Sequence, residues 1–485
     1  MKETYLRQDG TGLAGMVSSG EATAEELLDI ALELTEALNP ALNAVVMRRE
    51  EVARQAIRDG LPEGPFRGVP FLIKDLGAEA RAYPTNNGSR LMRGMEWSYD
   101  SEIFLRMQAT GVVTYARTAS PELGVGPVTE AGVYDGPTRN PWNTGHTSGG
   151  SSGGSGAAVA AGIVPMAHGS DGGGSVRIPA SSCGLVGFKP TRARLPDGPA
   201  SGEGWAGMAI DGVLTRSLRD SAAMLDACAG PDLGAPYWAP PMQGSYMEAM
   251  QRDPGQLRVR FSHETLSGDP LHPDCVAAVE KTARLLQDLG HEVAEFRPAA
   301  DLDVEAMMLA WTRIVACGTA LSVEKVLKGR PLDPEMVDGV TRGAIAYARE
   351  ISGADYLDAV GEVHAFGRRM AHVFLDCDVL LTPTLATPPA RVGQLAPVNE
   401  DFVAYRNGPG GVFEYSPFTA IFNASGQPAV SLPLHWSAED LPVGVHLAMA
   451  FGEDERLISL CGQIERAAPW TDKQLSLILG GIRPS

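Results

Sequence analysis

A serine preceded directly by three glycines is the part of this chain whose residue types point most clearly to reaction chemistry. Gly172, Gly173 and Gly174 come immediately before Ser175. Glycine reaches backbone angles that are closed to other residues, so the N–H groups of such a run can converge on one point. Converging donors stabilise the oxygen that becomes negative when a nucleophile attacks a carbonyl. The run therefore predicts an oxyanion hole with Ser175 as nucleophile, although a glycine-rich turn with a capping serine fits the same residues.

A serine hydroxyl is a weak nucleophile at neutral pH and needs a base, most often a histidine. His146 and His168 lie near the glycine-rich segments, but neither belongs to a motif that pairs it with an acid, so we interpret both as structural. Lys74 is the other candidate, because it closes the apolar run 70–73, which predicts a buried strand. Burial would keep this lysine neutral and basic, whereas a lysine at a strand end is otherwise a solvated charge.

A second Gly/Ser segment lies upstream of the first. Residues 148–156 read SGGSSGGSG, a composition that is usual in flexible linkers. They run directly into 157–162 (AAVAAG), which predicts a tightly packed helix of small residues that ends at its glycine. A tether has no need of such a helix, so we interpret the segment as part of the site.

Taken together, these segments resemble the amidase signature family, whose hallmarks are a GGSSGGS segment, a later G-x-D-x-G-G-S-x-R-x-P segment and an upstream lysine in a strand. All three occur here in that order. In that family the catalytic unit is Ser–cis-Ser–Lys, and the relay serine stands 24 residues before the nucleophile, as Ser151 does here. The resemblance therefore implies Ser175 as nucleophile, Ser151 as a relay serine after a cis peptide bond, and Lys74 as base.

The resemblance covers about residues 20–235 and 375–470 and leaves a divergent stretch at about 236–375. Within the family, the chain is most similar to the 6-aminohexanoate cyclic dimer hydrolase type, through the tripeptides AHG and SVR around the nucleophile and through Cys317. Gly172 departs from the family pattern, in which a non-glycine residue is usual at this position. This departure is expected to loosen the oxyanion turn.

The family fold, by resemblance, is a large mixed β-sheet sandwiched between helices, so we expect an α/β protein. The local patterns agree with this expectation. A capping box at 23–26 predicts a helix that Asn39-Pro40 ends, and 101–110 predicts a second helix followed by a strand at 112–115.

The family-like segments at the two ends of the chain must meet in one core, and no linker separates them. Residues 1–485 are therefore expected to form a single amidase domain. In this interpretation the divergent stretch, about 236–375, is mainly helical and shapes the substrate pocket.

Further residues receive supporting roles. Asp171 and Arg177 flank the glycine turn, and together with Ser152 they are expected to brace the site rather than react. The candidates for the substrate pocket are Cys317, Tyr134 and Trp205. Cys317 is included because of the subgroup resemblance, and a buried helix cysteine is the alternative.

The formal net charge of −19 argues against nucleic acid or an anionic membrane surface as partner. Residues 1–9 lack the apolar core of a signal peptide and no stretch of 18 or more apolar residues is evident, so we expect a soluble, cytoplasmic protein. The six cysteines show no CxxC spacing and no histidine partner pattern, so neither a metal nor a cofactor is expected. A monomer and a homodimer are both open.

The resemblance implies that a small-molecule amide or carbamate is hydrolysed at its C–N bond through an acyl-enzyme. Aryl amides, esters and urethanes also present a suitable carbonyl, while the subgroup favours secondary, cyclic or oligomeric amides. One alternative is a subunit of a glutamine-dependent amidotransferase that acts with partner chains, because such subunits share the triad. A catalytically inactive binding protein on the same fold is disfavoured by the intact Lys74, Ser151 and Ser175.

Overall fold

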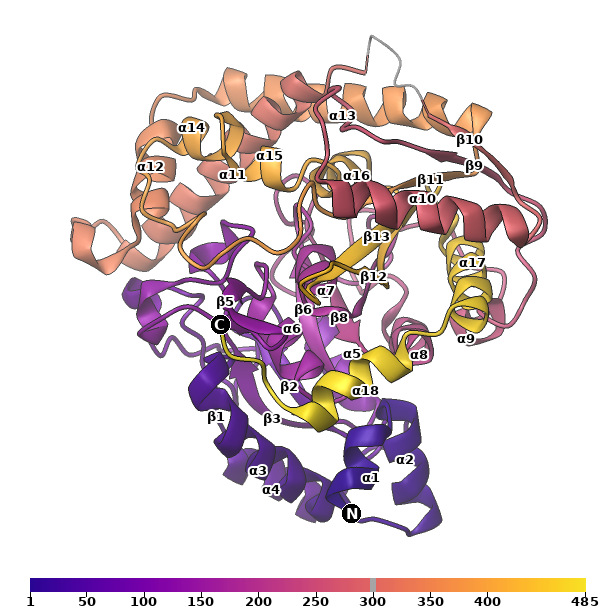
Figure 1. The fold of residues 1–485 in the computed structure, drawn as a ribbon. Coiled ribbons are helices and arrows are strands. Elements are labelled where there is room, and N and C mark those ends of the chain that lie inside the picture. Colours follow the sequence, from indigo (N-terminus) through magenta and orange to yellow (C-terminus); the bar gives the residue numbers. More distant parts are fainter. Residues whose placement is uncertain (297–301) are drawn as a thin grey trace.

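The computed structural model describes residues 1–296 and 302–485. Its centre is an 11-stranded sheet with the strand order β1-β3-β2-β6-β8-β7-β12-β13-β11-β9-β10, and β4 and β5 form a separate two-stranded sheet. The strands are β1 (Val45–Arg48), β2 (Pro70–Lys74), β3 (Val113–Thr118), β4 (Arg139–Asn140), β5 (Asn143–Thr147), β6 (Met166–Asp171), β7 (Val186–Lys189), β8 (Ile210–Thr215), β9 (Arg258–Phe261), β10 (Glu292–Glu295), β11 (Val379–Pro383), β12 (Ala429–Trp436) and β13 (Pro442–Ala448). Figure 1 shows the sheet crossing the molecule from β1 near α3 to β9 and β10 near α10 and α13.

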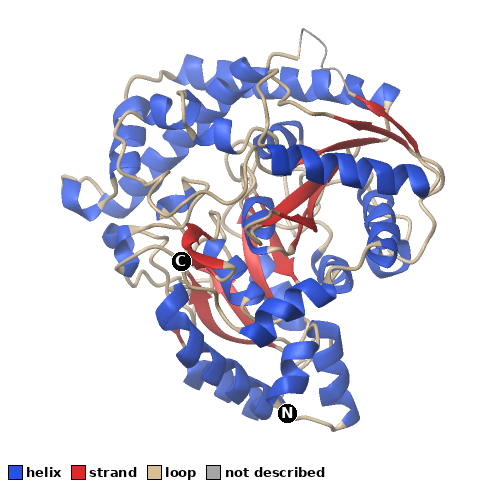
Figure 2. Ribbon diagram, in the orientation of Figure 1, coloured by secondary structure: helices blue, strands red, loops and turns tan. Residues whose placement is uncertain are grey.

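Helices surround this sheet. They are α1 (Lys2–Arg7), α2 (Gly10–Ser19), α3 (Ala24–Leu42), α4 (Glu50–Asp59), α5 (Glu102–Ala109), α6 (Gly153–Ala160), α7 (Arg177–Cys183), α8 (Leu218–Cys228), α9 (Tyr246–Ala249), α10 (Pro273–Asp288), α11 (Val304–Leu327), α12 (Gly339–Ala348), α13 (Gly353–Asp376), α14 (Phe402–Asn407), α15 (Val412–Tyr415), α16 (Thr419–Ser425), α17 (Asp454–Ala467) and α18 (Thr471–Gly480). Figure 2 shows the strands in the interior with helices on either side.

The sheet is mixed and is covered on both faces. β2 pairs in parallel with β3 and β6, whereas β6, β7 and β8 are joined by antiparallel pairs. Every residue of β2, β3, β7, β11 and β13 is buried. Because successive side chains of a strand face opposite sides, continuous burial requires cover on both faces. The expected α/β fold, a large mixed sheet sandwiched between helices, is confirmed.

The first predicted helix begins as expected and ends later. Thr23 and Glu26 form the capping box: the Glu26 N–H donates to Thr23 Oγ1 at 3.2 Å, and the Thr23 N–H donates to the Glu26 carboxylate at 2.8 Å. The helix continues past the predicted end at Asn39-Pro40, because Pro40 removes only one donor from the last turn. Asn43, in the left-handed conformation, closes that turn by donating its N–H to the Asn39 carbonyl at 2.8 Å.

The described residues of the divergent stretch, about 236–375, lie mainly in helices, and they also contribute two strands that the sequence did not reveal. β9 pairs in parallel with both β11 and β10, and α10 connects β9 to β10. Each strand has four residues with charged side chains among them, RVRF and EVAE, too short for a clear alternation of polar and apolar positions. The stretch therefore extends the sheet in addition to forming the helical layer.

α11 is a long and mostly apolar helix that charged residues such as Glu305 and Arg313 interrupt. By length and composition it could cross a membrane, with a mean hydropathy of 1.4 over its most apolar window. In the structure 56% of that window is buried inside the protein, and the helix packs against α12, α13, α14 and α16. Its apolar surface therefore contributes to the core of the helical layer.

Candidate active site

Lys74 ends the buried strand β2, and its side chain is fully enclosed. Its Nζ atom lies 2.6 Å from Ser151 Oγ and 2.9 Å from Ser170 Oγ. Burial lowers the pKa of Lys74 to about 7, against the opposing effect of the negative charges of Asp211 and Asp171. A lysine with such a pKa is partly neutral at physiological pH and can accept a proton.

Ser151 sits in the turn that leads into α6. The peptide bond between Gly150 and Ser151 is cis. Ser152, the next residue, donates its backbone N–H to the Ser175 carbonyl at 3.2 Å, and its Oγ exchanges hydrogen bonds with the Ser170 backbone at 3.2 and 3.3 Å. These contacts join the two Gly/Ser segments, so the turn that carries Ser151 lies against the turn that carries Ser175.

Ser175 lies between the glycine run and α7. It is 9% exposed, whereas Ser151 is 2% and Lys74 0% exposed. Accessibility therefore decreases from Ser175 to Ser151 to Lys74. A reactant can approach the Ser175 end of this series, while the lysine is kept away from water.

The backbone N–H groups of the glycine run and of Ser175 differ in whether they are bonded within the protein. The Gly174 N–H donates to Asp171 Oδ1 at 2.8 Å, so it is used inside the protein, and we correct its assignment to the oxyanion hole. Within the residues that the structure describes, the N–H groups of Gly172, Gly173 and Ser175 have no protein acceptor. These three donors remain available for an oxygen outside the chain, and the assignment of Gly172 and Gly173 to the oxyanion hole stays a prediction.

The expectation that Gly172 loosens this turn is also wrong. A Cβ atom at Gly172 would lie 2.6 Å from Cζ3 of Trp205, so the indole occupies the space where a side chain would stand. The Gly172 carbonyl accepts a hydrogen bond from Nε1 of Trp311 at 3.1 Å. The missing side chain is thus replaced by contacts from distant parts of the chain.

Asp171 and Arg177 form a fully buried ion pair beneath the turn. Arg177 Nη2 lies 2.8 Å from Asp171 Oδ1, and Arg177 Nε lies 3.0 Å from Oδ2. Burial by itself would raise the pKa of Asp171, but the charge and hydrogen bonds of Arg177 outweigh burial and hold this pKa below its usual range. The pair connects the start of the glycine run to the first turn of α7.

Two residues at the site were missed by sequence reasoning. Ser170 contacts Lys74 Nζ, and it stands on the same side of β6 as His168, two residues before it. Asn423, in α16, donates Nδ2–H to the carbonyl and the carboxylate of Asp171 and accepts from Arg177 at 2.7 Å. Ser170 could have been found from strand alternation, whereas Asn423 comes from a segment 252 residues away from Asp171.

Among the described residues, no hydrogen bond joins the ring of His146 or His168 to Ser151 or Ser175. His168 accepts the backbone N–H of Lys74 at Nδ1, at 3.2 Å, and its Nε2 lies 3.0 Å from Asp211 Oδ1. This pairing fits a neutral ring with its proton on Nε2. His168 thus supports the end of β2.

Among the three predicted pocket residues, Trp205 and Cys317 belong to one region. Gly318, next to Cys317 in α11, approaches Trp205 so closely that a Cβ there would lie 3.0 Å from the indole Cδ1. Cys317 is half-buried, and burial raises the pKa of its thiol. Since Trp205 is also close to Gly172, its indole lies between Gly318 of α11 and the glycine run.

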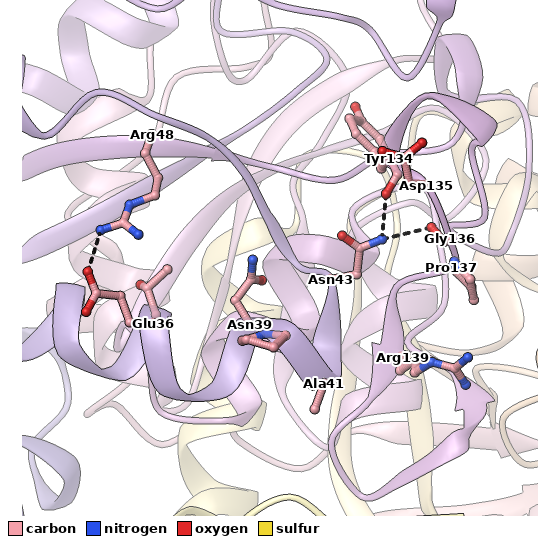
Figure 3. Close-up of a pocket in the computed structure, with 12 residues that line it drawn as sticks. Glu36, Asn39, Ala41, Asn43, Arg48, Tyr134, Asp135, Gly136, Pro137 and Arg139 are labelled. Carbon is pink, nitrogen blue, oxygen red and sulfur yellow. Dashed lines mark hydrogen bonds and ion pairs between the residues drawn. The ribbon is translucent and has the colours of Figure 1, made fainter.

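Tyr134 has a different environment. Its hydroxyl donates a hydrogen bond to Oδ2 of Asp75, the residue after Lys74, at 2.5 Å. Its carbonyl accepts a hydrogen bond from Asn43 Nδ2 at 3.0 Å. Tyr134 lines a pocket of about 650 Å³ together with the C-terminal part of α3, where Figure 3 shows Asn43 pointing at the 134–136 loop. The lining of that pocket does not include Ser175. A substrate contact for Tyr134 stays a prediction.

A family model described as Amidase matches residues 25–458. The chain therefore belongs to the amidase family, as the buried lysine, the paired serines and the glycine run lead one to expect, and it is a C–N hydrolase that acts on amides.

Within that family the chain is similar to several characterised relatives. The 6-aminohexanoate-cyclic-dimer hydrolase of Paenarthrobacter ureafaciens is 36% identical over 488 residues, which cover 99% of this chain and 98% of that one. The solved structure of a 6-aminohexanoate cyclic dimer hydrolase complexed with substrate has a TM-score of 0.92 at 35% identity, with 98% of this chain and 99% of that chain covered. A bacterial aryl acylamidase structure has a TM-score of 0.87 at 28% identity, with 98% of each chain covered.

Proposed function

We propose that this protein hydrolyses secondary, cyclic or oligomeric amides through an acyl-enzyme on Ser175, with Ser151 as proton relay and Lys74 as base. The observation that carries the proposal is the 2.6 Å distance between Lys74 Nζ and Ser151 Oγ in a fully buried setting. A buried lysine beside a hydroxyl is a base held ready for proton transfer, because no solvent stabilises its charged form.

The reaction follows from these positions. Neutral Lys74 accepts the proton of Ser151 Oγ, Ser151 accepts the proton of Ser175 Oγ, and Ser175 Oγ attacks the amide carbonyl. The N–H groups of Gly173 and Ser175 stabilise the negative oxygen that forms. The proton returns through the same relay to the leaving amine as the C–N bond breaks. Water, deprotonated through the relay, then attacks the acyl carbonyl. The bond from that carbonyl to Ser175 Oγ breaks, the proton returns through the relay to Ser175 Oγ, and the acid is released.

The substrate class is proposed from the relatives and from the surroundings of the site. A relative with 36% identity over nearly the whole chain is named for a cyclic dimer of 6-aminohexanoate. Trp205 places apolar surface beside the glycine run, which suits the methylene segments between the amides of such a compound. Aryl amides, esters and urethanes are further substrates to be tested.

The test is hydrolysis of a matched panel by the purified protein: the 6-aminohexanoate cyclic dimer, a p-nitroanilide, the corresponding ester and the corresponding aryl carbamate. Ser175→Ala is expected to abolish turnover of every compound that the wild type cleaves. Ser18→Ala, which changes an exposed serine of α2, is the matched control and should retain full activity. A folded wild type inert on all four compounds would contradict the proposal and favour the amidotransferase-subunit alternative.

A further inference from the structure

Trp311 reaches the oxyanion turn from a distant part of the chain. Its indole N–H donates to the Gly172 carbonyl at 3.1 Å across a sequence separation of 139 residues. The residue lies in α11, within the divergent stretch. We propose that Trp311 is a positioning residue for the oxyanion hole, because it holds the peptide group between Gly172 and Gly173 in the orientation that directs the Gly173 N–H at the reacting oxygen.

The argument depends on the geometry of one peptide group. In a trans peptide the C=O and the following N–H point in opposite directions. The cis peptide bonds in the described ranges are Gly150–Ser151 and Gly198–Pro199, so the Gly172–Gly173 bond is trans. Since the Gly172 carbonyl is directed at Trp311, the Gly173 N–H is directed away from the indole. That N–H has no protein acceptor among the described residues, which leaves it for an oxyanion.

The next peptide group provides a contrast within the same turn. The Gly173 carbonyl accepts from Thr419 Oγ1 at 2.6 Å, and the Gly174 N–H on the opposite side donates to Asp171 Oδ1 at 2.8 Å. Two neighbouring peptide groups are thus held by side chains from different helices. Trp311 orients a free donor, whereas Thr419 orients a donor that the protein already uses.

The indole is itself held in place. The guanidinium carbon of Arg406 lies 4.2 Å from the Trp311 ring centroid. The rings of Trp205 and Phe413 meet the indole nearly edge-on, at interplanar angles of 77° and 86°. Trp311 is 2% and Arg406 4% exposed. A cation over the ring face draws electron density from the indole and polarises its N–H, and a fixed donor needs no reorganisation when charge develops.

The inference rests on the proposed hydrolysis, and its test uses a substrate that the wild type cleaves. Trp311→Phe keeps an aromatic ring and removes the N–H donor. Thr419→Val removes the neighbouring donor at nearly constant shape and is the matched control. We expect Trp311→Phe to lower kcat by about 10- to 100-fold with KM within about twofold, and Thr419→Val to lower kcat by less than about tenfold.

Inhibitor affinity separates positioning from damage to the pocket. A trifluoromethyl ketone forms an adduct with the nucleophilic serine that carries an oxyanion, whereas the corresponding alcohol forms none. In Trp311→Phe we expect affinity for the ketone to fall about as much as kcat and affinity for the alcohol to stay unchanged. If Trp311→Phe does not fold, replacement of Trp311 by 3-benzothienylalanine, which exchanges N–H for sulfur in the same shape, carries the same expectations.

The outcomes are distinct. A folded variant with unchanged kcat and unchanged ketone affinity overturns the role of Trp311. Equal losses of affinity for the ketone and the alcohol also overturn it, because they indicate a damaged pocket. A wild type that cleaves nothing overturns the proposed function itself, whereas an active wild type with an unaffected Trp311→Phe variant overturns only the inference.

Discussion

Lys74 Nζ and Ser151 Oγ are 2.6 Å apart, and the lysine is completely buried while the serine is 2% exposed. A charged ammonium group in this position has lost its hydration, so burial lowers the pKa of Lys74 to about 7. The same burial that lets the lysine accept a proton therefore makes both activity and stability depend on pH.

The first prediction concerns activity and pH. Protonated Lys74 cannot accept a proton from Ser151, so kcat/KM is expected to fall below a pH of about 7, tenfold per pH unit. The measurement is kcat/KM for the p-nitroanilide from pH 5 to 9. Glu122, whose pKa burial raises to about 7, is the control, and Glu122→Gln should retain the acid limb. If the acid limb disappears in Glu122→Gln, the group that titrates is Glu122 and not Lys74, and the prediction is wrong.

The second prediction concerns stability in the variant Lys74→Met. A lysine in the unfolded chain has a pKa of about 10.4, so above pH 7 the unfolded state binds a proton that folded Lys74 does not. The free-energy cost of burying the charged Lys74 is fully present below its folded pKa. Above that pKa the cost decreases by about 1.4 kcal/mol per pH unit. The free energy of unfolding of wild type relative to Lys74→Met should therefore rise by roughly 2.7 kcal/mol between pH 6 and 9, most of it above pH 7.

Urea unfolding of both proteins at several pH values measures this difference, because groups shared by the two proteins cancel in the comparison. A difference between wild type and Lys74→Met that is constant with pH would show that Lys74 titrates alike in the folded and unfolded states.

The third prediction concerns the ion pair of Asp171 and Arg177. Arg177→Ala leaves the Asp171 carboxylate buried without its partner, and it should lower the free energy of unfolding by about 3–5 kcal/mol. The control is Arg7→Ala, which breaks the exposed pair with Glu3 and should cost about 0.5 kcal/mol or less. Urea midpoints compare the two variants, and a midpoint for Arg177→Ala equal to that of the control would refute the bracing role.

The fourth prediction concerns the space that Trp205 fills. A methyl group at Gly172 would meet the indole at 2.6 Å, so Gly172→Ala should displace Trp205, destabilise the protein by roughly 1–3 kcal/mol and reduce turnover. Gly15→Ala, in α2, meets nothing within 4 Å and should stabilise the protein by about 0.5–1 kcal/mol. Thermal unfolding and initial rates test both, and full activity with an unchanged Tm in Gly172→Ala would contradict the tight packing.

Elements whose signals lie within a few residues were predicted correctly from sequence. Thr23 caps α3, Ser101 caps α5 and the apolar run 70–73 lies in a buried strand, because capping and periodicity depend on near neighbours. β9 and β10 were missed, since a strand of only four residues is defined by the strands it pairs with rather than by its own pattern.

The sequence by itself determined the family, the fold class and the identity of Lys74, Ser151 and Ser175 as candidates, because residue types and spacing in short segments carry that information. Which glycine donors remain free was decided by the tertiary structure. The direction of a peptide N–H depends on the partner of the carbonyl in the same peptide group. Here those partners are Trp311 and Thr419, 139 and 246 residues away from the glycines that they hold, and only the packing of the helices onto the sheet brings them there.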